Sequence, residues 1–122
     1  MTGLFETAPK ALIVSNNVVE ADDLTEMLTE QGLAPVIHVR DVEGAQAVLE
    51  QHRASLRLVM CGLLMHETEV SSFVQAQERS AWSLVLIDPP VAQNGREGIN
   101  VLLRPFSTAD VMAALFRLGL KS

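Results

Sequence analysis

The chain has 122 residues, 48% of them hydrophobic, and a formal net charge of -6. This length and apolar content predict one compact domain with a substantial core. The negative charge, with no run of Lys or Arg, argues against nucleic-acid binding. A single cysteine, Cys61, excludes an intrachain disulfide and a multi-cysteine metal site, and it fits a reducing compartment.

The ends of the chain carry no sign of export or of membrane insertion. Residues 1–9 are predicted to be an N-terminal extension and residues 10–122 a single domain. The first ten residues lack the basic start and apolar run of a signal peptide. No apolar stretch approaches the roughly 20 residues that a membrane helix needs. We therefore expect a cytoplasmic protein with no membrane association.

In the first half of the chain, short apolar runs alternate with amphipathic segments. Residues 10–14, 34–39 and 56–64 are predicted strands, and the last of these is apolar enough to lie centrally in a sheet. Asn17 is expected to cap a first helix with Glu20 three residues on, and Gly32 to end it. Asp41 is expected to cap a second helix. Pro35 places the second strand at a sheet edge.

The second half repeats the alternation with one interruption. Residues 67–79 are predicted to be helical, residues 83–87 and 101–103 to be strands, and Ser107 with Asp110 to start a last helix. Residues 89–100 contain two prolines and an Asn-Gly pair, and they lack an apolar stripe of helical length. A loop or a single turn is predicted there, so that the fourth helix is shortened or absent.

The order of these elements predicts an α/β fold, a doubly wound five-stranded parallel sheet of order 2-1-3-4-5. In such a sheet, ligands bind beyond the carboxyl ends of the strands where the winding reverses. The residues expected at that edge are Ser15, Asn16, Cys61 and Asp88.

Leu103-Arg104-Pro105-Phe106, at the end of the last predicted strand, is similar to the Lys-Pro-Phe motif of bacterial response-regulator receiver domains. With this motif in place, the chain resembles the flavodoxin-like (CheY-like) receiver from about residue 10 to residue 118. The resemblance places the family's acidic pair on Ser15 and Asn16, its phosphoacceptor Asp on Cys61, its hydroxyl residue on Asp88 and its lysine on Arg104.

All five of these positions depart from the family pattern, which predicts a pseudo-receiver. Phosphoryl transfer to a carboxylate needs a nucleophilic oxygen, a hard cation and a fixed positive charge. Ser15, Asn16 and Cys61 offer Mg²⁺ no carboxylate, and a thiol is a soft ligand. We therefore expect no metal, no cofactor, no phosphorylated aspartate and no enzymatic activity.

Other polar residues receive more modest interpretations. Arg104 is predicted to pair with Asp88, the alternative being that both face solvent. Cys61 is predicted to be a small buried hydrophobe rather than a redox-active thiolate. His38, His52 and His66 lack the spacing of metal ligands, so structural or surface roles are expected.

Two surfaces are candidates for contact with a partner. A shortened fourth helix would leave apolar groups uncovered, and Trp82, Val91, Ile99 and Phe106 are predicted to meet a second copy or a partner protein. The alternative is that the loop folds over the gap. The acidic residues of the first helix, Asp22, Asp23 and Glu26, are interpreted as a solvated face, although the resemblance implies that this helix docks a kinase or phosphotransferase.

Together these observations predict a protein-protein interaction module in two-component (phosphorelay) signalling. Its partner would be a histidine kinase, a phosphotransferase, a regulator or a second copy of the chain. Two alternatives stay open: an atypical receiver phosphorylated on Asp88, and a small-ligand or redox sensor that uses the crevice near Cys61 and Arg104.

Overall fold

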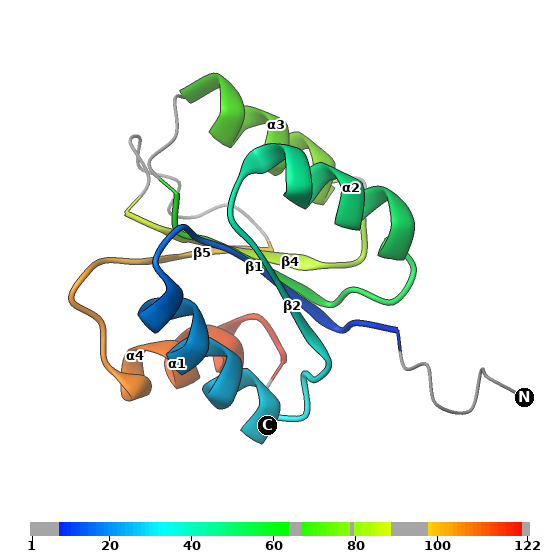
Figure 1. The fold of residues 1–122 in the computed structure, drawn as a ribbon. Coiled ribbons are helices and arrows are strands. Elements are labelled where there is room, and N and C mark those ends of the chain that lie inside the picture. The colour runs from blue at the N-terminus through cyan, green and yellow to red at the C-terminus, as the bar shows by residue number, and fades with distance from the viewer. Residues whose placement is uncertain (1–7, 64–66, 79, 89–97, 121–122) are drawn as a thin grey trace, which may run out of the picture.

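The computed structural model describes residues 8–63, 67–78, 80–88 and 98–120, and for residues 67–70 it describes the backbone only. Five strands and four helices are assigned in that part of the chain (Figure 1). In chain order they are β1 (Ala11–Val14), α1 (Val18–Glu30), β2 (Val36–Val39), α2 (Val42–His52), β3 (Leu58–Cys61), α3 (Glu67–Glu78), β4 (Ser83–Ile87), β5 (Ile99–Leu102) and α4 (Thr108–Arg117).

The strands form one parallel sheet in the order β2-β1-β3-β4-β5, which confirms the predicted topology. β2 lies at an edge, and Pro35 directly precedes it, where its missing N–H costs no ladder bond. The register aligns Val14 of β1 with Cys61 of β3, and Cys61 with Leu86 of β4. The three strands therefore end together at one edge of the sheet, which we call the carboxyl edge.

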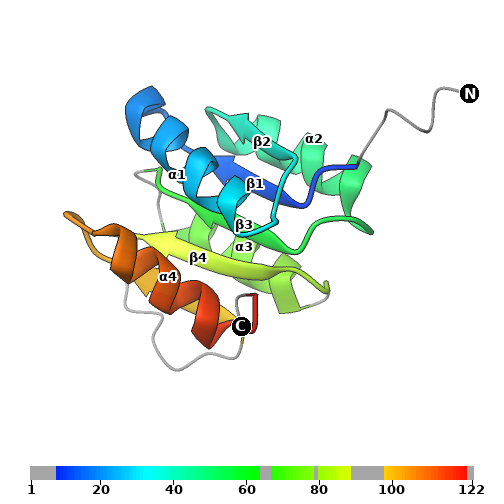
Figure 2. The same ribbon diagram turned by 90° about the horizontal axis from the view of Figure 1, so that it is seen from below.

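Two helices cover each face of the sheet, so the fold has three layers. α2 and α3 lie on one face, and α1 and α4 lie side by side on the other (Figures 1 and 2). Because side chains alternate along a strand, Leu12 and Val14 of β1 pack toward α2 and α3, whereas Ile13 packs toward α1 and α4. β1, β3 and most of β4 are buried, as expected of central parallel strands.

Local capping starts three of the helices at the predicted residues. The side chains of Asn17 and Asp41 accept hydrogen bonds from backbone N–H groups three residues on, and Ser107 and Asp110 form a reciprocal capping box. Gly32, with φ of +78°, follows the end of α1 in the left-handed region that glycine enters without strain. These boundaries confirm the sequence-based expectations.

The last strand and one proposed interface require correction. β5 begins at Ile99, not Val101, because Ile99 and Asn100 pair with Leu84 and Val85 of β4. Trp82 is 2% exposed and Ile99 is 7% exposed, so neither offers surface to a partner. Both side chains are instead buried in the apolar core of the chain itself.

The two other residues predicted at an interface are Phe106 and Val91. Phe106 is half-buried against the core beneath α1 and α4 and keeps part of its ring accessible. Val91 and the prediction of a shortened fourth helix lie outside the described residues, as do His66 and the N-terminal extension up to residue 7. Within the described residues no helix is long and apolar enough to cross a membrane.

Candidate functional site at the carboxyl edge

The two residues after β1 serve the local backbone. The Ser15 side chain is buried, and its hydroxyl oxygen accepts a hydrogen bond from the Asn17 N–H at 3.1 Å. The Ser15 carbonyl accepts a 2.7 Å hydrogen bond from Nε2 of His38 on β2. Asn16 is exposed. His38 therefore has the structural role expected for it, and Ser15 contributes no ligand at the surface of this edge.

Cys61, at the position where the resemblance places the acceptor aspartate, is part of the core. Its side chain is 2% exposed and packs in the cluster between the sheet and helices α2 and α3, together with Val14 and Phe73. This placement confirms the interpretation of Cys61 as a small buried hydrophobe. A thiol without solvent access lacks the partly exposed, electropositive setting of reactive cysteines.

Arg104, just beyond β5, reaches across the carboxyl edge and contacts three other segments. Its Nε and Nη2 each donate to a carboxylate oxygen of Glu20 at 2.8 Å, a bidentate ion pair. Nη2 also donates to the carbonyl oxygen of Gly62 at 2.9 Å, directly after β3. Nη1 lies 3.3 Å from Oδ2 of Asp88, at the end of β4. We call this set of contacts the Arg104 clamp.

Asp88 supplies both a charge and a backbone anchor to the clamp. Its Oδ1 accepts the Arg104 backbone N–H at 3.0 Å, while its own N–H donates to the Leu102 carbonyl at 2.9 Å. The Asp88 backbone has φ of +49°, a left-handed conformation that Asp tolerates better than most residues. The predicted pair of Asp88 with Arg104 is thus present in the structure, at a longer distance than the pair with Glu20.

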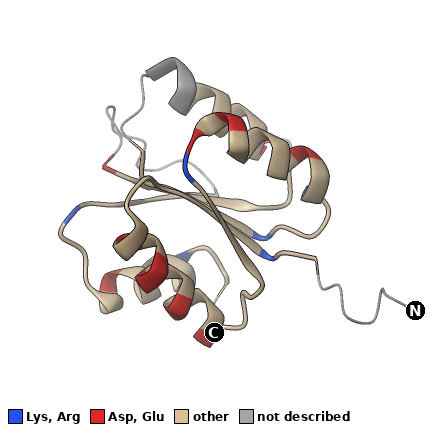
Figure 3. Ribbon diagram, in the orientation of Figure 1, with Lys and Arg blue, Asp and Glu red and all other residues tan. Residues whose placement is uncertain are grey.

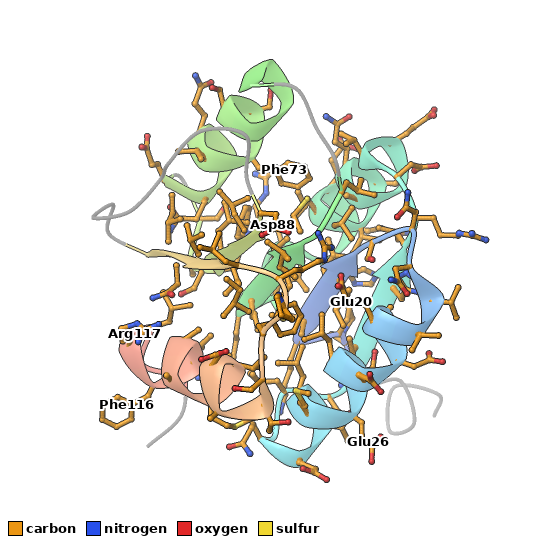
Figure 4. The ribbon with its side chains drawn as sticks, turned by 90° about the vertical axis from the view of Figure 1, so that its left-hand side faces the viewer. Glu20, Glu26, Phe73, Asp88, Phe116 and Arg117 are labelled. Atoms are coloured by element: carbon orange, nitrogen blue, oxygen red, sulfur yellow. The ribbon has the colours of Figure 1, made fainter. Side chains whose placement is uncertain are left out.

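Glu20 was missed as a site residue by sequence reasoning, and the reason is local. Its spacing from Asn17 is that of a capping box, in which the Glu side chain would turn back to the N-cap N–H. Here the Ser15 hydroxyl takes that N–H instead, which leaves the Glu20 carboxylate for Arg104. Figure 4 looks onto this end of the sheet and shows Glu20 and Asp88 there, while Glu26 points outward from α1.

The electrostatics favour a permanently charged guanidinium. The hydrogen bonds to Glu20 raise the pKa of Arg104, burial opposes this effect, and the charge of Glu20 and the contacts with Asp88 add to the increase. The Glu20 side chain is 12% exposed, while those of Arg104 and Asp88 are 37% and 40% exposed. The clamp therefore lies at the boundary between core and solvent, where water screens it only in part.

A groove of about 570 Å³ adjoins the clamp between α1 and the segment from β5 to α4. Glu20 and Arg104 form part of its wall. The rest is lined by the polar residues Asn17 and Asp23 and by the apolar residues Val19, Met27, Pro105 and Phe106. Glu20 and Arg104 therefore take part both in the contacts at the carboxyl edge and in the wall of the groove.

The polar groups at the carboxyl edge are largely engaged with one another. The two carboxylates near Arg104 are already engaged by its guanidinium, and Cys61 lies in the core. Among the described residues there is no group of three His, Cys, Asp or Glu side chains that could hold a metal ion. The guanidinium of Arg104 joins its own segment to the three others that it contacts.

Comparisons with known proteins agree with this architecture. A scan against models of protein families finds no match, and neither does a search of curated proteins. Among solved structures, a response regulator receiver domain protein from Bacillus halodurans C-125 is similar, with 14% identity, a TM-score of 0.64, and coverage of 92% of this chain and 97% of that one. SdrG from Sphingomonas melonis Fr1 is similar as well, with 24% identity, a TM-score of 0.66, and coverage of 93% and 98%.

Both likenesses extend over nearly the whole of each chain. This chain therefore has the CheY-like receiver fold, as its strand order and its Arg-Pro-Phe segment predicted.

Proposed function

We propose that this protein is a receiver-like interaction module of two-component signalling that works without phosphorylation of an aspartate. The observation that carries the proposal is the bidentate pair of Arg104 with Glu20, extended to the Gly62 carbonyl. It fills the carboxyl edge with a side-chain cation beside the position where a receiver would accept phosphate. A non-enzymatic role in the cytoplasm follows as part of the same proposal.

Phosphorylation is tested most directly by mass. The protein is incubated with Mg²⁺ and a small phosphodonor, and its intact mass is followed beside that of an active receiver domain treated in the same way. We expect the control to gain a phosphoryl group and this chain to keep its mass. A phosphoryl adduct that disappears in the Asp88→Asn variant would replace the proposal with the atypical receiver phosphorylated on Asp88.

The acidic side of α1 is the surface best suited to a signalling partner. Figure 3 shows acidic residues along α1, which contains no Lys or Arg. Val19, in the first turn, is 71% exposed and lines the groove beside Asp23. Val19 shares this groove with the apolar residues Met27 and Phe106, and an exposed apolar cluster with polar residues around it is typical of a protein-protein contact. We propose that a histidine kinase or phosphotransferase domain docks here.

Two exposed apolar residues on different helices provide a matched test. Val19 on α1 is 71% exposed and Phe116 on α4 is 65% exposed. In a titration with a histidine-containing phosphotransfer domain, followed by NMR, we expect Val19→Asp to weaken binding at least tenfold and Phe116→Asp to leave it unchanged. The reverse result, or a dimer in sedimentation that only Phe116→Asp dissociates, would move the interface to α4 and to a second copy of the chain.

A further inference from the structure

One guanidinium connects segments that lie far apart in the sequence. Arg104 follows β5, Glu20 lies in the first turn of α1 and Gly62 directly follows β3. The contacts from Arg104 to Glu20 and Gly62 measure 2.8–2.9 Å, within the range of strong charge-assisted hydrogen bonds. Because a guanidinium is planar, these contacts fix both the position and the orientation of Glu20.

The space around the guanidinium is limited by the residue at position 62. A Cβ placed on Gly62 would lie 2.9 Å from Nη2 of Arg104 and 3.0 Å from Oε1 of Glu20. Both distances are shorter than ordinary van der Waals contact, so a Cβ at this position would require the ends of the Arg104 and Glu20 side chains to shift from their present contacts. The backbone of Gly62 is not in the left-handed region, so the requirement for glycine here is steric rather than conformational.

The clamp also shapes the neighbouring groove. Glu20 and Arg104 both line it, one from α1 and the other from the segment that continues into Pro105 and Phe106. If the two side chains separate, the first turn of α1 loses its link to that segment. The width of the groove beside Val19 then depends on packing farther down α1.

We infer that Gly62 is the third component of a built-in lock, in which the Glu20–Arg104 pair seats against the Gly62 backbone and holds the α1 groove in its binding shape without any ligand. The inference rests on the proposed function, because it concerns the regulation of the same surface. Both members of the ion pair are side chains of this chain, so the contact that holds the first turn of α1 forms without a ligand.

Amide hydrogen exchange on the full chain tests the lock through two reporters, the amides of residues 20 and 104, which are hydrogen-bonded to Asn17 and Asp88. Gly62→Ala and Arg104→Met are compared with the double variant and with Glu26→Gln, which removes an exposed charge from the same helix. We expect each single variant to speed exchange of both amides about tenfold, equivalent to about 1.4 kcal/mol. Glu26→Gln should match the wild type.

The decisive comparison is between the effect of Gly62→Ala on exchange in the wild-type chain and its effect in the Arg104→Met variant. Once Met replaces Arg104, the alanine methyl no longer meets a guanidinium, so adding Gly62→Ala should change exchange less than twofold. Wild-type exchange in Gly62→Ala, or an equal effect of Gly62→Ala in both backgrounds, would overturn the lock. If Gly62→Ala does not fold, recovery of the fold in the double variant supports the lock. If neither folds, Glu20→Gln decides through the same two amides, and unchanged exchange there overturns it.

The lock and the proposed function can fail separately. The mass of the wild-type chain after treatment with phosphodonor reports on phosphorylation alone. Exchange in the variants reports on the clamp alone. Normal exchange in Gly62→Ala without any phosphoryl adduct would leave the interaction module intact and remove only its lock.

Discussion

Helices α1 and α2 flank the same strand, β1, yet they are attached to the protein in different ways. α1 fully buries three residues, Ala21, Leu24 and Leu28, whereas α2 fully buries only Ala45. α1 is also tied at its polar first turn, where Glu20 meets Arg104. The helix that carries the proposed docking surface is therefore fixed in two ways, by an apolar stripe and by an ion pair.

The apolar attachment provides the largest expected effect. Leu24 is completely buried on α1, and Leu49 on α2 is half-buried. We expect Leu24→Ala to lower the free energy of unfolding by about 2–5 kcal/mol, because it leaves a cavity in a closed core. Leu49→Ala should cost about 1–2 kcal/mol, since part of its surface is already hydrated. Urea unfolding of both variants checks this, and equal losses would contradict the asymmetry between the helices.

The ionic attachment should contribute less, because water reaches part of it. We expect Arg104→Met to lower the free energy of unfolding by about 1–2 kcal/mol, between the values for an exposed ion pair and for a buried charge-assisted hydrogen bond. The loss should shrink as salt is added, since ions screen the pair in the wild type. A difference from the wild type that is independent of salt would mean that packing of the Arg104 stem, not its charge, is responsible.

The next largest loss of stability is expected from removing a capping interaction on α4, the helix that shares a face of the sheet with α1. Ser107 and Asp110 close a capping box at the start of α4. We expect Ser107→Ala to cost about 1 kcal/mol through the loss of the bond to the Asp110 N–H. Thermal unfolding measures the cost, and exchange at residue 20 should stay as in the wild type. Faster exchange at residue 20 would show that α4 and the clamp are coupled.

The smallest effect is expected from alkaline pH. The pKa of Arg104 is raised, chiefly by its hydrogen bonds to Glu20. A raised pKa of a cation stabilises the folded state at every pH below the unfolded value, and the stabilisation is lost only as pH rises through the folded value. The difference in unfolding free energy between the wild type and Arg104→Met should therefore stay constant from neutral to moderately alkaline pH. A decrease over that range would assign the stabilisation to another group.

Much of the fold was accessible from the sequence because its signals are local. Caps at Asn17, Asp41 and Ser107 act within one turn, and apolar runs of strand length indicate parallel strands buried on both faces. The start of β5 was predicted two residues late, because the Gly and Asn that flank Ile99 are typical of loops. Only pairing with β4 places Ile99 and Asn100 in the sheet.

The candidate site was accessible only in part. The sequence placed Arg104 and Asp88 at one edge, because parallel strands end together, and it assigned Cys61 to the core on the strength of its apolar neighbours. It gave no reason to pair Glu20 with a residue 84 positions away, and its spacing from Asn17 suggested a local bond instead. Trp82 was assigned to an interface because composition alone does not show which apolar residues the sheet already covers.

By itself, the sequence determined the order of strands and helices and the absence of a carboxylate at Ser15, Asn16 and Cys61, since both depend on residue type and on short-range spacing. Only the tertiary structure decided which carboxylate Arg104 binds and which atoms a side chain at position 62 would meet. Those contacts join segments from opposite ends of the chain, and a guanidinium selects its partners by direction and distance, which exist only after the strands have assembled.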